Sequence, residues 1–189
     1  MYDKYFNMAI SNNEIKRLKA LQQKKFRDEE GLFIAEGDKM LEEAERSRFH
    51  VECVYRRDSI GEEAMKRISA LASPSPVLAV IRKPSDAYVD DISSLKGLIS
   101  EGGLFLALDT IRDPGNLGTI IRIADWFGIK AIFAAKDTVD VFNPKVVQAT
   151  MGAVFRVRLH YVDLPELTGM MTGLGGKVYG TFLDGNNMY

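Results

Sequence analysis

Short apolar blocks alternate with amphipathic stretches along the first half of the chain. The apolar runs that are typical of strands lie at 32–35, 51–55 and 77–81. The stretches with helical spacing of apolar residues are 12–27, 38–46 and 62–71. We therefore expect a small α/β unit here, with Ile15, Leu18 and Phe26 on the buried side of its first helix.

The second half repeats this alternation with longer spacings. Strand-like runs occur at 104–108, 130–134, 154–159 and 177–182. Helical patterns occur at 117–127, 144–151 and 164–172. Strands that alternate with helices predict a parallel sheet with right-handed crossovers. Residues 83–100, rich in Pro, Ser and charges, are expected to connect two domains, 1–90 and 91–189.

A polar loop after the strand at 104–108 is the most promising functional segment. That strand is an unbroken apolar run, which is typical of a strand buried on both faces of a parallel sheet. Asp109 would then lie at its carboxyl end. Open α/β sheets bind ligands beyond the carboxyl ends of their strands, so the loop over 109–116 is where function is sought first.

The helix after this loop has two distinct faces. At 100° per residue, one face carries Leu117, Ile120, Ile121, Ala124 and Phe127, with Gly128 as the C-terminal cap. Arg122 falls on the opposite side. Gly118 lies one turn before Arg122 and is expected to leave space beside the guanidinium. Trp126 lies one turn after Arg122 and is expected to cover the far side of the guanidinium.

Each part of this segment also has an ordinary explanation. Asn116 could cap the helix, Pro114-Gly115 could form a turn, and Arg122 could be a solvated surface charge. Capping alone does not explain the combination of Asp-Pro-x-Asn-x-Gly with an Arg six residues after the Asn.

This segment resembles the first signature motif of the SpoU (TrmH-like) branch of the SPOUT RNA methyltransferases. The matching residues are Asp113, Pro114, Asn116, Gly118 and Arg122. Residues 143–153 resemble the family's following helix, with Thr150 where the family often has Ser. The resemblance implies methyl transfer from S-adenosylmethionine to a ribose 2′-hydroxyl.

The amino-terminal part resembles the small substrate-binding domain of the same family, a fold akin to ribosomal protein L30e. The resemblance lies in residues 11–13, in the basic run to Arg27 and in residues 31–39. The resemblance implies an L30e-like domain over 1–90 and a SPOUT domain over 91–189. The family's Gly-Asn/Ala-Glu-Gly and Ser-Leu-Asn-Val-Ser motifs, which build the trefoil knot, do not occur in the 189 residues, so we expect a C-terminally incomplete SPOUT domain.

The resemblance also assigns roles to single residues. Arg122 and Asn116 are the expected catalytic residues. An arginine has a pKa above about 12 and is a poor base, so we expect Arg122 to stabilise the developing alkoxide. Asn116 would hold the loop or the ribose, while Asp113 and Pro114 would shape the loop.

Binding residues are expected in three places. The adenosine edge of the cofactor pocket is assigned to Thr181, Phe182 and Leu183. A basic patch for RNA is assigned to Lys16, Arg17, Lys24 and Arg27. Glu36 and Gly37 are expected to fix an RNA-facing turn, and Trp126 is expected at the interface of a homodimer, as in the family, rather than stacked on a base.

Composition narrows these expectations. The formal net charge of −1 creates no global field toward RNA, so contacts must come from a local patch. The chain has one cysteine, Cys53, and neither a signal-peptide core nor a membrane-spanning apolar stretch, so we expect a cytoplasmic protein. His50 and His160 are isolated, and no metal site is expected.

Three functions stay open at this point. The first is an S-adenosylmethionine-dependent RNA ribose 2′-O-methyltransferase, with ribosomal RNA favoured over transfer RNA by family analogy. The second is a catalytically inactive RNA-binding module that lacks the knot. The third is an unrelated nucleotide-binding α/β protein. The glycines before Lys177 do not form a phosphate loop, because no Gly stands five residues before Gly176 and no Ser or Thr follows the Lys.

Overall fold

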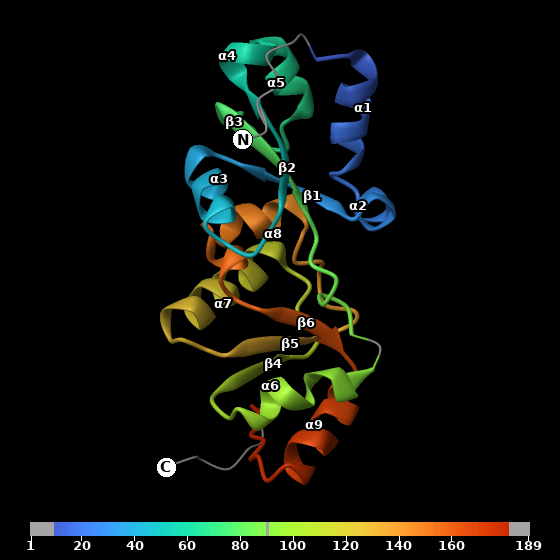
Figure 1. The fold of residues 1–189 in the computed structure, drawn as a ribbon, viewed down its shortest axis with the longest axis vertical. Helices are drawn as coiled ribbons and strands as arrows, with labels where there is room; N and C mark the ends of the chain where they lie inside the picture. The colour runs from blue at the N-terminus through green and yellow to red at the C-terminus, as the bar shows by residue number, and fades with distance from the viewer. Residues whose placement is uncertain (1–9, 90, 182–189) are drawn as a thin grey trace.

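The structure, a computed structural model, describes residues 10–89 and 91–181. It contains two three-stranded sheets stacked along the long axis, with helices outside each sheet and between them (Figure 1). None of the helices in this described part is long and apolar enough to cross a membrane.

The first sheet is antiparallel with the strand order β1-β3-β2. Its strands are β1 (Leu32–Glu36), β2 (Val51–Arg56) and β3 (Val77–Arg82). The helices of this unit are α1 (Asn12–Ala20), α2 (Lys24–Glu30), α3 (Asp38–Glu45), α4 (Arg57–Ile60) and α5 (Glu62–Ile68). Side chains alternate between two apolar clusters, because successive residues of a strand point to opposite faces: Phe33 packs toward the second sheet, and Leu32 and Ile34 pack toward α1 and α5.

The second sheet is parallel with the order β4-β5-β6, as the alternation of elements predicts. Its strands are β4 (Phe105–Leu108), β5 (Ala131–Ala135) and β6 (Leu159–Val162). The side toward the first sheet carries α7 (Pro114–Trp126), α8 (Pro144–Ala149) and the 3₁₀ turn η2 (Ala153–Phe155). The other side carries η1 (Ile92–Leu95), α6 (Lys96–Ser100) and α9 (Leu164–Gly173).

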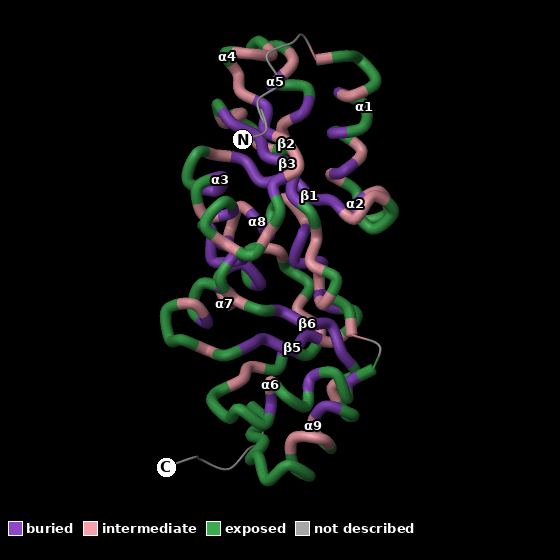
Figure 2. Tube along the Cα trace, in the orientation of Figure 1, coloured by how far each residue is buried: buried purple, intermediate pink, exposed green. Residues whose placement is uncertain are grey.

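One apolar core joins the two units. Phe33 of β1 lies 4.8 Å from Phe142 and 6.4 Å from Phe155, measured between ring centroids, and the same cluster includes Leu117 and Ile121 of α7. Figure 2 shows buried residues in the region between the two sheets. Because α7 and α8 pack against the first unit, residues of both units can line one surface groove.

The prediction of a single helix over residues 12–27 is wrong. The chain turns at residues 21–23, so 12–27 divides into α1 and α2. The predicted connection over 83–100 also contains helical turns, because Ile92, Leu95 and Ile99 are spaced to bury one face in η1 and α6.

Three predictions in the second half are also wrong. Val154 and Phe155 pack in the core from η2, and the strand begins only at Leu159. Residues 177–181 have no regular structure and are exposed, while residue 182 lies outside the described range. The strand β4 is not buried on both faces: in the described chain it pairs only with β5, and Ala107 is exposed.

Candidate functional site

The Asp-Pro pair of the motif starts helix α7. The Asp113 side chain accepts a hydrogen bond of 2.7 Å from the Asn116 backbone N–H, and Pro114 occupies the first helical turn. The helix therefore begins three residues before the predicted start at 117. Asn116 is not the cap; it is exposed in the first turn, and its side-chain amide makes no hydrogen bond within the described residues.

Gly118 allows α7 and α8 to approach closely. A Cβ atom at Gly118 would lie 2.4 Å from the Cβ of Ala149. Gly118 is buried against α8, so the expectation that it leaves open space beside Arg122 is wrong. The glycine instead places the loop, α7 and the end of α8 beside one another.

We expect the substitution Gly118→Ala to destabilise the protein by about 1–3 kcal/mol, because the added methyl group overpacks the contact between α7 and α8. Thermal or urea unfolding measures this loss. The matched control is Gly169→Ala in α9, where an added Cβ meets nothing within 4 Å and helix propensity favours alanine. Equal stability of the two variants would contradict the close approach.

Arg122 lines an open groove of about 470 Å³ that both units border. The groove is lined by Lys39 of α3, by Thr119, Arg122, Ile123, Asp125 and Trp126 of α7, and by Thr150, Met151, Ala153 and Arg156. Arg122 is exposed and makes no hydrogen bond or ion pair within the part of the chain that the structure describes. Its guanidinium is therefore available to a ligand.

Arg156, the second arginine of this groove, is fully engaged. Its Nε and Nη2 donate to the Asp125 carboxylate at 3.0 and 2.8 Å, and its Nη1 donates to the Glu43 carboxylate. The hydrogen bonds that Arg156 donates to the Asp125 carboxylate, opposed by partial burial, raise the pKa of Arg156 above its ordinary value. Sequence reasoning missed Lys39 and Arg156 as groove residues, since only the packing of α3 and η2 against α7 brings them there.

The prediction of which face of α7 is buried is partly wrong. Phe127 is 71% exposed and Trp126 is 85% exposed, and Ile123 and Met151 are also exposed. Trp126 lines the groove beside Arg122 but does not bury its guanidinium. These four side chains form an exposed apolar face next to the groove, which we call the α7 face.

The loop before α7 is tied to the neighbouring strand. Asp109 follows β4, as predicted, and the Thr110 hydroxyl donates to Asp109 at 3.0 Å or to Asp137 at 2.9 Å. Thr110 has a φ of 55°, a left-handed conformation that threonine rarely adopts. These contacts fix the carboxyl edge of the sheet.

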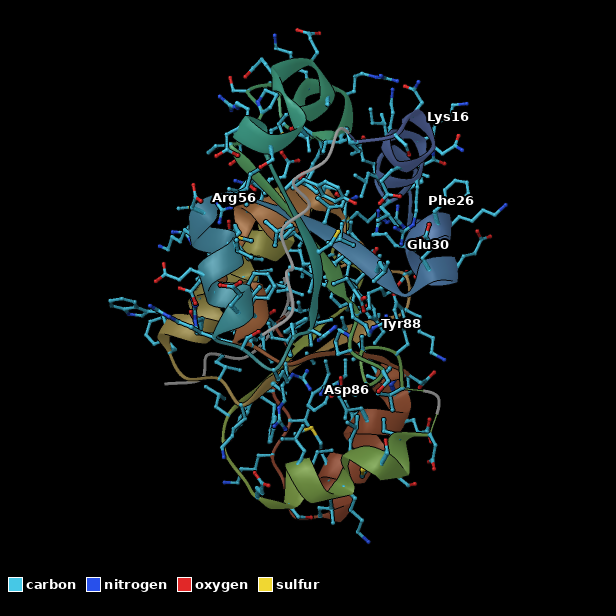
Figure 3. The ribbon with its side chains drawn as sticks, turned by 45° about the horizontal axis from the view of Figure 1, so that its top comes forward. Lys16, Phe26, Glu30, Arg56, Asp86 and Tyr88 are labelled. Atoms are coloured by element: carbon cyan, nitrogen blue, oxygen red, sulfur yellow. The ribbon has the colours of Figure 1, made fainter. Side chains whose placement is uncertain are left out.

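The predicted basic patch does not form one free surface. Lys16 is exposed and makes no ion pair within the described chain, whereas Arg17 pairs with Glu30 of α2 at 2.7 Å (Figure 3 labels Lys16 and Glu30). Lys24 pairs with Asp28, whose pKa is lowered because hydrogen bonds from Lys24 and Lys83 outweigh partial burial. An RNA-binding role for Lys16, Arg17 and Lys24 stays a prediction.

Arg27 is not a surface residue, and its assignment to an exposed patch is wrong. It is 1% exposed, and it donates to the Asp140 carboxylate at 3.0 and 2.6 Å and to the backbone oxygens of Leu21 and Gln22. The break between α1 and α2 turns this side chain inward, where it bridges the two units.

Glu36 is also buried, so it cannot contact RNA directly. Its carboxylate accepts hydrogen bonds from the Ser69 hydroxyl at 2.6 Å and the Ala70 N–H at 2.7 Å. Gly37 has a φ of 114° and precedes α3, whose Lys39 lines the groove. The turn at Glu36-Gly37 thus positions a groove residue.

The assignment of the cofactor edge to Thr181, Phe182 and Leu183 stays a prediction. Thr181 is exposed in an irregular segment, and Phe182 and Leu183 lie outside the described residues. No group of three or more His, Cys, Asp or Glu side chains in residues 10–89 and 91–181 could hold a metal ion.

Two family descriptions match different parts of the chain. Residues 12–83 match the MRM3-like substrate binding domain, and residues 103–189 match the SpoU rRNA Methylase family. Among curated proteins, the chain is 28% identical over 196 residues to the 23S rRNA (guanosine(2553)-2′-O)-methyltransferase RlmP of Bacillus subtilis, covering 96% of this chain and 75% of that protein. It is 34% identical to the mitochondrial rRNA methyltransferase 3 of Xenopus laevis, of which it spans 36%.

Solved structures show the same relationship. A putative RNA methyltransferase of the TrmH family from Porphyromonas gingivalis is 34% identical, with a TM-score of 0.77 over 93% of this chain and 72% of that one. An AdoMet-bound rRNA methyltransferase from Sinorhizobium meliloti is 26% identical, with a TM-score of 0.74 over 88% of this chain and 68% of that one. With the motif at 113–122 on its expected loop and helix, the chain belongs to the SpoU (TrmH) family of RNA methyltransferases.

Proposed function

We propose that this protein takes part in methylating the 2′-hydroxyl of a ribose in ribosomal RNA, with S-adenosylmethionine as the methyl donor. The observation that carries the proposal is the Arg122 guanidinium, which has no partner among the described residues and lines a groove bordered by both units, on the helix that begins with the family motif. Relatives named as rRNA methyltransferases support the substrate class.

The reaction requires charge stabilisation near the ribose. A 2′-hydroxyl is almost wholly protonated at neutral pH and develops negative charge as it attacks a methyl carbon. A fixed cation at that oxygen lowers the barrier because the charge of the transition state is stabilised more than that of the substrate. Arg122 fits this role, and Lys39 across the groove is placed to bind a neighbouring phosphate.

Asn116 fits a supporting role in this reaction. It is exposed one and a half turns before Arg122, and its amide makes no competing hydrogen bond among the described residues. An amide can donate to a ribose oxygen and accept from a hydroxyl at the same time. We assign it to holding the ribose in line with the donor.

The proposal that S-adenosylmethionine is the methyl donor is supported by the relatives and not by a cofactor pocket among the described residues. S-adenosylmethionine would supply the activated methyl group, and the S. meliloti structure is described with AdoMet bound. In this chain Thr181 is exposed in an irregular segment, and Phe182 and Leu183 lie outside the described residues. The contribution argued from this structure is therefore that of Arg122, Asn116 and Lys39 toward RNA.

Methyl transfer to RNA tests the proposal directly. The chain is incubated with S-adenosylmethionine labelled in its methyl group and with a ribosomal RNA transcript, and the RNA is digested for mass spectrometry. We expect a nucleoside methylated at its 2′-oxygen. RNA binding without methyl transfer would favour the RNA-binding module, and the absence of both would contradict the proposal.

We also propose that the α7 face binds a second copy of the chain. Four large apolar side chains are exposed there, and such a patch beside a functional groove is typical of an interface. A homodimer would place its partner against the apolar wall of the groove that contains Arg122.

We expect Trp126→Glu to convert the dimer to a monomer, because a carboxylate would be desolvated at the centre of the interface. Light scattering coupled to size-exclusion chromatography measures the mass. The control is Leu174→Glu, which changes another exposed apolar residue, at the end of α9 on the opposite side of the second sheet. A wild-type monomer, or a Trp126→Glu dimer, would contradict this interface.

A further inference from the structure

Two arginines line the same groove but differ in their partners. Arg156 is held by Asp125 and by Glu43, whereas Arg122 is unpaired within the described residues. Both guanidiniums belong to the wall made by α7 and η2. The ion pairs of the groove therefore engage one arginine and leave the other free.

Asp125 is within reach of Arg122 along the helix. The two residues are three apart in α7, and side chains at this spacing are neighbours on the helix surface. An aspartate and an arginine so placed form an ion pair when no stronger partner competes. Arg156 is that competitor, because it contacts Asp125 through both Nε and Nη2.

The packing around η2 keeps Arg156 in this position. Glu43 of α3 lies against the turn at Gly152, where an added Cβ would be 2.9 Å from the Glu43 Cγ. The same Glu43 carboxylate accepts a hydrogen bond from Arg156. The guanidinium is thus held from α3 and from α7 at the end of the groove.

We propose that Arg156 is a positioning residue that holds Asp125 away from Arg122 and so keeps the Arg122 guanidinium free to meet the ribose. This inference rests on the proposed function of Arg122. Without Arg156, Asp125 would pair with Arg122, neutralising its charge and placing a carboxylate where negative charge develops.

Rescue by a second substitution tests this role. We expect Arg156→Gln to lower kcat/KM for RNA methylation by about fivefold. This factor corresponds to the upper range of the free energy of an exposed ion pair. The double variant Arg156→Gln/Asp125→Asn should return to within about twofold of Asp125→Asn alone, because asparagine cannot neutralise Arg122. Thermal unfolding of every variant separates this effect from a loss of fold.

Glu43→Gln is the matched control. It weakens the link from Arg156 to α3 but leaves the link to Asp125, so we expect a smaller loss of rate than in Arg156→Gln. A double variant as slow as Arg156→Gln would overturn the proposal, since Arg156 would then act directly on RNA or on the packing of the units. A Glu43→Gln variant as slow as Arg156→Gln would also overturn it, because the pair between Arg156 and Asp125 would then not set the rate.

A crystal structure of the Arg156→Gln variant without RNA provides a readout that needs no activity. We expect an ion pair between Arg122 and Asp125, with a nitrogen and an oxygen within about 4 Å. If the wild type transfers no methyl group, the proposed function fails while this structure still decides the pairing. An Arg122 that stays unpaired in that structure would overturn the inference about Arg156.

Discussion

Replacing Arg122 with alanine is expected to lower kcat/KM for RNA methylation by about 10²- to 10³-fold, the loss that follows removal of one group aimed at a developing oxyanion. The guanidinium is exposed in the groove without a partner in the described chain, so the variant should fold normally. Methyl incorporation under single-turnover conditions, at saturating RNA, measures the chemical step separately from binding.

The substitution Arg122→Lys separates charge from geometry. Lysine keeps the positive charge but loses the planar fork, so we expect a rate between those of alanine and arginine. The control is Arg46→Ala, which removes the exposed arginine at the C-cap of α3, a residue that pairs with Glu42 of that helix. A lysine variant that methylates RNA at the parental rate would contradict the assigned role.

Replacing Arg27 with alanine is expected to destabilise the protein by about 3–5 kcal/mol, because it leaves the Asp140 carboxylate buried without its cation. Asp140 is 6% exposed, and its remaining partners are the Tyr88 hydroxyl at 3.3 Å and the Phe142 N–H at 3.1 Å. Neither carries a charge. Urea unfolding monitored by circular dichroism measures the loss.

The control for Arg27 is Lys25→Ala on the same helix. The Lys25 side chain is 75% exposed and lies 3.9 Å from Glu29, so we expect a change below about 1 kcal/mol. Arg27→Lys, which keeps the charge but loses the paired contact to Asp140, should fall between the two. An alanine variant as stable as the control would show that the buried pair does not join the two units.

The pattern of the chain predicted the parallel arrangement of the second sheet, the starts of two of its strands and the position of the motif loop. Alternating apolar runs give β4 and β5 within one residue of their predicted starts, and the Asp-Pro motif lies at the carboxyl edge that was expected to carry function. These features depend on residues near one another in the chain, where periodicity and capping are strong signals.

The same local reasoning misplaced side chains whose surroundings come from distant segments. Arg27 matches a basic helix face by periodicity, but its partner Asp140 lies 113 residues later. Gly118 suggests free space by its small size, but α8 occupies that space. No local pattern encodes either neighbour.

The sequence by itself determined the family motif, the parallel order of alternating strands and helices, and the position of Arg122 on the outer side of its helix, because each depends on spacing along one segment. Only the tertiary structure decided which cations stay free. The packing of α3 and η2 against α7 brings Lys39, Arg156 and Asp125 to one groove, and the balance of their ion pairs leaves Arg122 without a partner in residues 10–89 and 91–181.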